Sequence, residues 1–494
     1  MPTQNFGIGG FSYRSLIALT WPQFMMMLLQ MLIGFTDVYV AGRIGSGVQA
    51  AMGMVLECFF MILIIASTTS SGILATVGQS VGAGKPDRAQ RYAGMGIMIA
   101  IAICFLLMLT VYLNRQPILD LVKVPAEIQP VGIYFLNVTL LTLPAHYLLV
   151  LSGAIFRAHG KVWVPLCSIF LASVVNVIGD FGLGLGYFGM PEFGYKGIAW
   201  ATFFSVSAAA VFNLIVLIKL GLVGRKSIVS WRWMKKGAPY MIKISIPTFI
   251  MQVFWNLGYV ILYMVTATLP ADSINAVAGL TTGLNIEGIL YMPGAAFSMT
   301  ASIVVGNLLG RRKIEEAKKA VSRILKVGTI SMCCVAFGLW FVAPQITAFV
   351  ASDQYVAGHA LTYLRFNICS TPFTMFSLIL NGCMVGAGAT RYNLIANTGS
   401  TWLVRLPIAY VFGHVLWQSS TGVFMAMLIS QVFLSSSLFY VFKRRNWPRF
   451  AMIKAETPRQ GVPQSMPPNI GSSVHTPPAP AEKPFADSNN SGNN

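Results

Sequence analysis

Charged residues are scarce in this chain. Of its 494 residues, 10% are Asp, Glu, Lys or Arg, against about 25% in an ordinary soluble domain, whereas 55% are hydrophobic. Only fifteen residues are acidic. This composition excludes an ordinary soluble domain and indicates an all-α protein that crosses a membrane many times.

The residues of common catalytic and metal sites are also few and scattered. The five histidines and seven cysteines show no metal-ligand spacing. The sequence has no His-Glu-x-x-His run, no Gly-Lys-Thr phosphate loop and no useful Ser/Lys arrangement. We therefore expect no cofactor and no enzymatic activity.

Twelve apolar segments are long enough to span a bilayer. The first has no small-residue cleavage site, so we expect no cleavable signal peptide. The expected spans are residues 15–41, 49–78, 92–113, 131–156, 163–187, 197–219, 240–268, 275–305, 320–342, 357–385, 393–416 and 421–443.

The basic residues that give the net charge of +19 lie mainly in alternate loops. This distribution is typical of an oriented membrane protein and does not indicate a nucleic-acid partner. One set of alternate loops is strongly basic and includes Lys85, Lys161, Lys313 and the linker near residue 230. Because Lys and Arg concentrate in cytoplasmic loops, both termini and the linker are predicted to be cytoplasmic, with the protein in the inner membrane. The opposite loops hold only Arg43, Arg115, Lys123 and Lys196.

The chain also repeats itself weakly, because glycines and prolines recur at an offset of 225 to 228 residues. Two halves of six helices each would share one orientation, related by a pseudo-two-fold axis along the membrane normal. We expect an N-lobe over 1–219, a basic linker over 220–239, a C-lobe over 240–445 and a mostly disordered tail over 446–494. The recurring pairs are Pro22 and Pro247, Gly53 and Gly279, Gly78 and Gly306, Pro144 and Pro372, Gly160 and Gly388, and Gly197 and Gly422.

Two carboxylates inside apolar segments of the first half, Asp37 and Asp180, are the strongest functional signal. A carboxylate at the centre of a membrane helix costs about 2.5–3.5 kcal/mol on insertion scales. Asn176 lies four residues before Asp180, so a helix places both on one face. The offset maps the two acids onto Leu262 and Ile408, so the second half has no equivalent pair.

Two interpretations of this pair remain open. Polar residues can serve as packing contacts between membrane helices. Alternatively, they can form an ion or proton site, and burial and mutual repulsion favour protonation of such a pair. An acid pair confined to one half fits a cation site in that half, for either H⁺ or Na⁺.

Two further carboxylates, Glu57 and Glu287, lie at roughly equivalent positions of the repeat. Arg405 is the basic residue deepest in the second half, so a Glu287–Arg405 pair is one interpretation, and contact with substrate is another. Polar residues that could line a substrate cleft are Gln30, Glu57, Gln252, Asn256, Glu287 and Arg405.

From residue 15 to about 445 the chain resembles the multidrug and toxic compound extrusion (MATE) transporters. The similarity implies two six-helix lobes around a central cleft and cation-coupled export by alternating access. The motifs that carry it are TDVYVAGRIG at 36–45, VGQSVGAG at 77–84, GMPEFGYKG at 189–197, GAGATR at 386–391 and VRLP at 404–407.

The resemblance also implies that Asp37, Asn176, Asp180 and Thr202 form a cation site in the N-lobe. Other members of the family place an essential glutamate in the seventh helix. Here that position is Trp255, with Asn256 beside it. This departure favours the N-lobe site.

We therefore expect an antiporter that exports organic cations or amphipathic compounds in exchange for H⁺ or Na⁺, as a monomer in the bilayer. A flippase for lipid-linked precursors, from the same superfamily, is an alternative that the twelve segments and the few intramembrane bases disfavour. An ion channel is a third possibility, and it would differ by carrying an uncoupled current.

Overall fold

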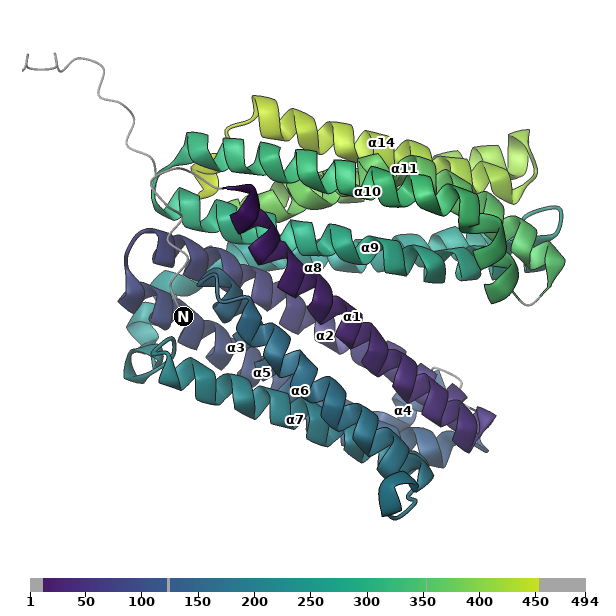
Figure 1. Cartoon of the computed structure of the whole chain (residues 1–494), viewed down its shortest axis with the longest axis horizontal. Helices are drawn as coiled ribbons and strands as arrows, with labels where there is room; N and C mark the ends of the chain where they lie inside the picture. Colours follow the sequence, from purple (N-terminus) through teal and green to yellow (C-terminus); the bar gives the residue numbers. More distant parts are fainter. Residues whose placement is uncertain (1–11, 122–124, 352, 453–494) are drawn as a thin grey trace, which may run out of the picture. The chain divides into compact units, whose positions relative to one another are not determined.

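The computed structural model describes residues 12–121, 125–351 and 353–452, and within these ranges the chain is helical with no strand (Figure 1). Helices satisfy all their backbone hydrogen bonds internally, which a lipid environment demands. Eleven of the described helices are long and apolar enough to cross a membrane.

The first half of the chain builds the N-lobe. Its long helices follow the predicted apolar segments, and the fifth of them continues from α-helical into π-helical turns. The elements are α1 (Tyr13–Ile44), α2 (Ser46–Gly82), α3 (Pro86–Leu113), the short α4 (Arg115–Leu121), α5 (Gln129–Ala158), α6 (Trp163–Gly179) with the π-helix η1 (Asp180–Gly184), the 3₁₀ turn η2 (Tyr187–Gly189) and α7 (Tyr195–Lys219).

The second half builds the C-lobe in the same order. Pro22 in α1 and Pro247 in α8 both lie inside their helices, as the repeat predicts. The elements are α8 (Trp231–Ala267), α9 (Ser273–Gly310), α10 (Ile314–Val350), α11 (Gln354–Ala387), α12 (Thr390–Gly399), η4 (Ser400–Arg405), α13 (Leu406–Tyr410), η5 (Val411–Leu416), α14 (Ser420–Arg444) and the 3₁₀ turn η6 (Trp447–Phe450).

The eleventh predicted span is present but interrupted. Residues 390–416 form one helical run in which π-helical turns, η4 and η5, alternate with the α-helical segments α12 and α13. Together with the eleven uninterrupted spans, this run completes the predicted twelve-helix, two-lobe fold. The π turns occur in the fifth helix of each lobe.

The lobes meet along α2 and α9, which pack against each other at their C-terminal ends (Figure 1). A Cβ atom on Gly82 would lie 2.1 Å from the carbonyl oxygen of Asn307, and one on Gly310 would lie 2.3 Å from that of Gln79. Glycine is required at both positions because the backbones touch. Asn307 Nδ2 also donates to the carbonyl of Ala158 at 3.1 Å, from the C-lobe to the N-lobe.

The segment between the lobes is shorter than predicted. It contains the 3₁₀ turn η3 (Arg225–Ser227), and α8 already begins at Trp231, capped by the hydroxyl of Ser230. The amphipathic residues 231–239 therefore continue directly into the membrane helix. Lys226 pairs with Asp87 at 2.8 Å, which attaches the linker to the start of α3.

The chain after α14 packs back onto the lobe contact. Trp447 is fully buried. The hydroxyl of Tyr240 donates to the carbonyl of Phe450 at 2.8 Å, and the backbone N–H of Met452 donates to Gln79 Oε1 at 2.7 Å. The predicted tail therefore begins with ordered contacts, and its remainder, 453–494, lies outside the described residues.

Candidate functional site

The N-lobe site is built around the transition from α6 to η1. A π-helical turn widens the helix and is frequently found at functional positions. A Cβ on Gly179 would lie 2.7 Å from Cβ of Ala201, and one on Gly197 would lie 2.1 Å from the carbonyl oxygen of Leu183. These glycines let α7, the helix of Ala201 and Thr202, approach α6 and η1 closely.

The predicted residues Asp37 and Asn176 are in direct contact. Asn176, fully buried on α6, donates from Nδ2 to Oδ1 of Asp37 on α1 at 3.1 Å. Asp37 and Asp180 are close enough to interact electrostatically. The structure thus brings together an amide and two carboxyls that are separated by more than a hundred residues in the sequence.

Asp180 is the most exceptional group at this site. Its side chain is fully buried, and neither carboxyl oxygen accepts a hydrogen bond from an N–H or hydroxyl group within the described structure; its polar neighbour is the carboxyl of Asp37. Oδ1 of Asn176 is unpartnered as well. Buried polar atoms are normally hydrogen-bonded, and a buried charge without a partner is strongly unfavourable. The site therefore has surplus acceptors, which a proton or a small hard cation would satisfy.

Thr202 contributes less than predicted in this conformation. Its half-buried hydroxyl donates to the carbonyl of Ile198 within α7, at 3.2 Å. The hydroxyl oxygen keeps acceptor capacity for a cation. No group of three or more His, Cys, Asp and Glu side chains that could hold a metal occurs among the described residues.

The predicted cleft residues differ in their surroundings. Gln30 on α1 and Glu57 on α2 have exposed side chains. Asn256 and Gln252 are half-buried on α8, where the Asn256 amide donates to the carbonyl of Gln252 at 2.8 Å. Glu287 and Arg405 line the same pocket, and it lies in the C-lobe.

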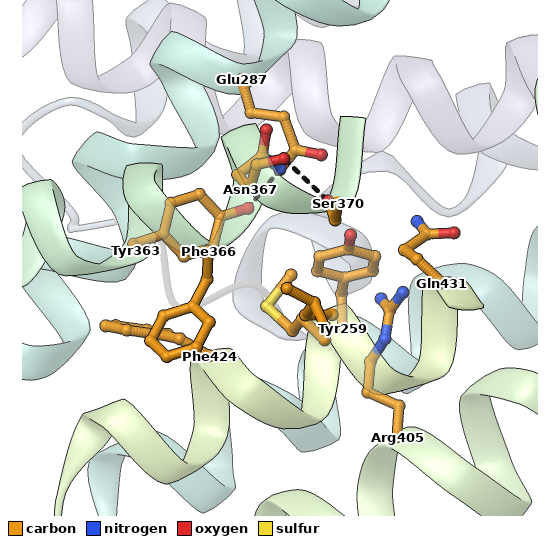
Figure 2. Close-up of a pocket in the computed structure, with 11 residues that line it drawn as sticks. Tyr259, Glu287, Tyr363, Phe366, Asn367, Ser370, Arg405, Phe424 and Gln431 are labelled. Atoms are coloured by element: carbon orange, nitrogen blue, oxygen red, sulfur yellow. Dashed lines mark hydrogen bonds between the residues drawn. The ribbon is translucent and has the colours of Figure 1, made fainter. Parts of the chain in front are cut away.

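This C-lobe pocket is shown in Figure 2. Glu287 accepts a hydrogen bond from the hydroxyl of Tyr363, and Arg405 Nε donates to Ser430 Oγ at 2.9 Å. The predicted Glu287–Arg405 ion pair is absent from the described structure because each group bonds elsewhere. The lining residues are Tyr259, Glu287, Tyr363, Phe366, Asn367, Ser370, Arg405, Phe424, Met427, Leu428 and Gln431.

Several of these lining residues were not identified from the sequence. Tyr363 and Asn367 are four residues apart on α11, which places them on one helix face. That spacing of polar residues inside an apolar segment was the available signal. Gln431, in the last helix, has the same polar character and a buried Oε1 without a partner in the part of the chain that the structure describes.

The family model MatE matches this chain twice, at residues 22–181 and 247–411, once in each lobe. The two matches fall in corresponding parts of the two halves, as expected for a duplicated six-helix unit. Together they cover well over half of the chain.

Curated relatives are similar to this chain over most of its length. The probable multidrug resistance protein NorM of Thermotoga maritima is 22% identical over 445 residues, covering 90% of this chain and 95% of the relative. The multidrug resistance protein PmpM of Pseudomonas aeruginosa is 23% identical over 418 residues, covering 83% and 86% of the two chains.

Solved structures show the same fold. A MATE transporter in a bent conformation superposes with a TM-score of 0.80 at 19% identity, covering 87% of this chain and 95% of that one. An outward-facing multidrug resistance MATE family transporter gives the same TM-score, identity and coverage. The chain therefore belongs to the MatE family, whose members are membrane transporters rather than enzymes.

Proposed function

We propose that this protein is a secondary active multidrug exporter that exchanges organic cations or amphipathic compounds for H⁺ or Na⁺. The names of its relatives, multidrug resistance proteins, support the substrate class. The observation that carries the coupling is the buried Asp180 carboxyl, which accepts no hydrogen bond from an N–H or hydroxyl group of the described residues and lies beside the carboxyl of Asp37.

The chemistry of this pair supports coupling to a small cation. Two anions in a poorly hydrated site repel each other and lose hydration, and a bound proton or Na⁺ relieves both costs. The acceptor-only set of Asp37, Asp180 and the Asn176 oxygen suits either ion. Occupancy would change how α1, η1 and α7 pack, because all three helices surround the site.

Orientation is part of the proposal. The basic loops favour cytoplasmic termini in an inner membrane. The lobe contact at Gly82 and Gly310 would then close the cytoplasmic side in this conformation. Cysteines introduced at Ser46 and Lys313 test the orientation, since an impermeant maleimide should label the first only from outside and the second only from inside.

Efflux from proteoliposomes tests the function. A fluorescent organic cation should leave vesicles that contain the protein when a pH or Na⁺ gradient is imposed, and should not move without the gradient. Asp180→Asn and Asp37→Asn should each reduce gradient-driven efflux to the level of empty vesicles. Asp87→Asn is the matched control, because Asp87 is an exposed carboxylate outside the site.

Full gradient-dependent efflux by Asp180→Asn or Asp37→Asn would contradict the proposed coupling. Measuring both gradients with the wild-type protein identifies the ion. Dependence on the pH gradient alone assigns H⁺, and dependence on the Na⁺ gradient at constant pH assigns Na⁺.

A further inference from the structure

The C-lobe pocket is lined in part by the helices that correspond, in the repeat, to those that carry the acid pair of the N-lobe. In the N-lobe, Asp37 lies on the first helix, Asp180 on the fifth and Thr202 on the sixth. In the C-lobe the corresponding helices contribute Tyr259 on α8, Arg405 on η4 and Gln431 on α14. The fifth helix of one lobe thus carries a buried acid, and that of the other carries a buried base.

Arg405 is buried with hydrogen-bonding capacity to spare. Its side chain is 4% exposed, and its guanidinium carbon lies 5.6 Å from the centre of the Tyr259 ring. Nε donates to Ser430, whereas Nη1 is buried without a partner among the described residues. Figure 2 shows the guanidinium directed into the pocket, between Tyr259 and Gln431.

The second unsatisfied group of the pocket is an acceptor. Gln431 Oε1 is also buried without a partner in the described structure. A ligand that satisfies both groups must offer an acceptor to Arg405 and a donor to Gln431. A guanidinium prefers carboxylates, whose geometry matches its planar fork, and hydrogen bonds between charged groups are the strong ones.

We propose that the C-lobe pocket binds the carboxylate of a zwitterionic organic solute, with the solute's ammonium group donating toward Gln431 and Glu287. The carboxylate of Glu287 also lines the pocket, so a solute with two negative charges would be disfavoured by repulsion. The free space in the pocket is small, so the pocket takes only the charged head of a solute, and the rest of the solute stays outside it.

This inference goes beyond the proposed function, because binding at Arg405 requires no coupling through Asp37 and Asp180. The two can fail separately. Asp180→Asn should lose gradient-driven efflux and keep the carboxylate preference described below, whereas changes at Arg405 should remove the preference.

A matched pair of probes tests the proposal. Nε-dansyl-lysine carries a free ammonium and a carboxylate on a flexible arm, and its methyl ester lacks only the negative charge. Fluorescence anisotropy with the full-length protein in detergent gives a Kd for each. The wild-type protein should bind the acid about tenfold or more tightly than the ester, as expected for one charge-assisted hydrogen bond.

Arg405→Gln should abolish this preference, because it should weaken binding of the acid and leave binding of the ester unchanged. Arg405→Lys keeps a buried positive charge but lacks the planar guanidinium, so it should reduce the preference without removing it. This variant replaces Arg405→Gln in the test if Arg405→Gln does not fold. Arg365→Gln is the control, since Arg365 is an exposed arginine of α11 that contacts Trp340. Equal binding of acid and ester by wild type, or an unchanged preference in Arg405→Gln, would overturn the proposal.

Discussion

At the scale of single residues, Asp180 and Arg405 share one property. Each is a buried ionisable side chain with hydrogen-bonding atoms that no neighbour in the described structure satisfies. A protein that used these groups only for packing would gain by pairing them, because unpaired buried charge is costly. Our two proposals assign a ligand to each, a cation to Asp180 and an anionic group to Arg405.

Asp272, which lies outside the membrane-spanning helices, shows the opposite situation. Asp272, in the turn before α9, accepts hydrogen bonds from His359 Nε2 at 2.8 Å and from Asn275 Nδ2 at 2.6 Å. The hydrogen bond from His359 lowers the pKa of Asp272 below its ordinary value, with a smaller contribution from Asn275. His359 also bonds to Ser420, which connects this turn to α14.

The pH dependence of this pair can be predicted with its sign. Because the pKa of Asp272 is depressed on folding, its contribution to stability is present above the unfolded value and is lost as pH falls through the folded value. Asp272→Asn should lower the melting temperature slightly at pH 6, since the pair is exposed and worth little. The difference from wild type should shrink on acidification. A difference that grew as the pH fell would contradict this.

At the scale of elements, the lobe contact depends on glycine. Gly82→Ala would place a methyl group 2.1 Å from the carbonyl oxygen of Asn307, a backbone atom that cannot move aside alone. Overpacking of this kind costs about 1–3 kcal/mol. We expect a lower melting temperature in detergent and slower efflux. Gly53→Ala, in the same helix with nothing within 4 Å of the added Cβ, should be tolerated. Equal behaviour of the two variants would exclude a steric role for Gly82.

The end of the chain contains two regions that should respond differently to deletion. Residues 447–452 bury Trp447 and bond to Tyr240 and Gln79 near the lobe contact. Deletion of residues 447–494 should therefore lower the melting temperature and weaken efflux. Deletion of 455–494 should leave both unchanged, since that part of the sequence is rich in Pro, Ser and Asn and has no long apolar run. Loss of efflux in the shorter deletion, with normal expression, would contradict this prediction.

Hydropathy predicted the twelve spans because, in lipid, the backbone N–H and C=O groups of a long apolar run can find hydrogen-bond partners only within a helix. It missed the true start of α8 at Trp231, because residues 231–239 are amphipathic and carry no membrane signal. It also missed the π turns η1, η4 and η5, which depend on neighbouring helices rather than on local composition. Arg405 was identified as a lone intramembrane base, whereas its pocket partner Gln431 has no such distinguishing charge.

At the scale of the whole molecule, the candidate cation site and the lobe contact lie at opposite ends of α2. Asp37 is close to the C-terminal end of α1, where α2 begins, whereas Gly82 is the last residue of α2. An ion bound at Asp37 therefore cannot act on the lobe contact directly. It must act by changing the packing of whole helices, and α1 is the natural candidate because it contacts both η1 and α9.

This separation leads to a prediction about competition. Pro22 lies inside α1 between the Asp37 end and the start of the helix, where it removes a backbone hydrogen bond and permits bending. Close to this proline, Gln23 Nε2 donates to Thr300 Oγ1 of α9 at 3.0 Å, so a change in α1 reaches the C-lobe. If the cation and the exported solute each prefer a different arrangement of α1, each must weaken binding of the other.

Equilibrium binding of a cationic dye measures that competition. Its affinity should fall about 5- to 150-fold as pH drops from 8 to 5, or as Na⁺ rises at constant pH, which is the usual range of coupling between two sites. Reciprocity requires the dye to weaken binding of the ion by the same factor. In Asp37→Asn and Asp180→Asn the dye affinity should no longer depend on pH or Na⁺, because the charge that the ion neutralises is gone. A wild-type affinity that stayed constant across both titrations would exclude coupling through this acid pair.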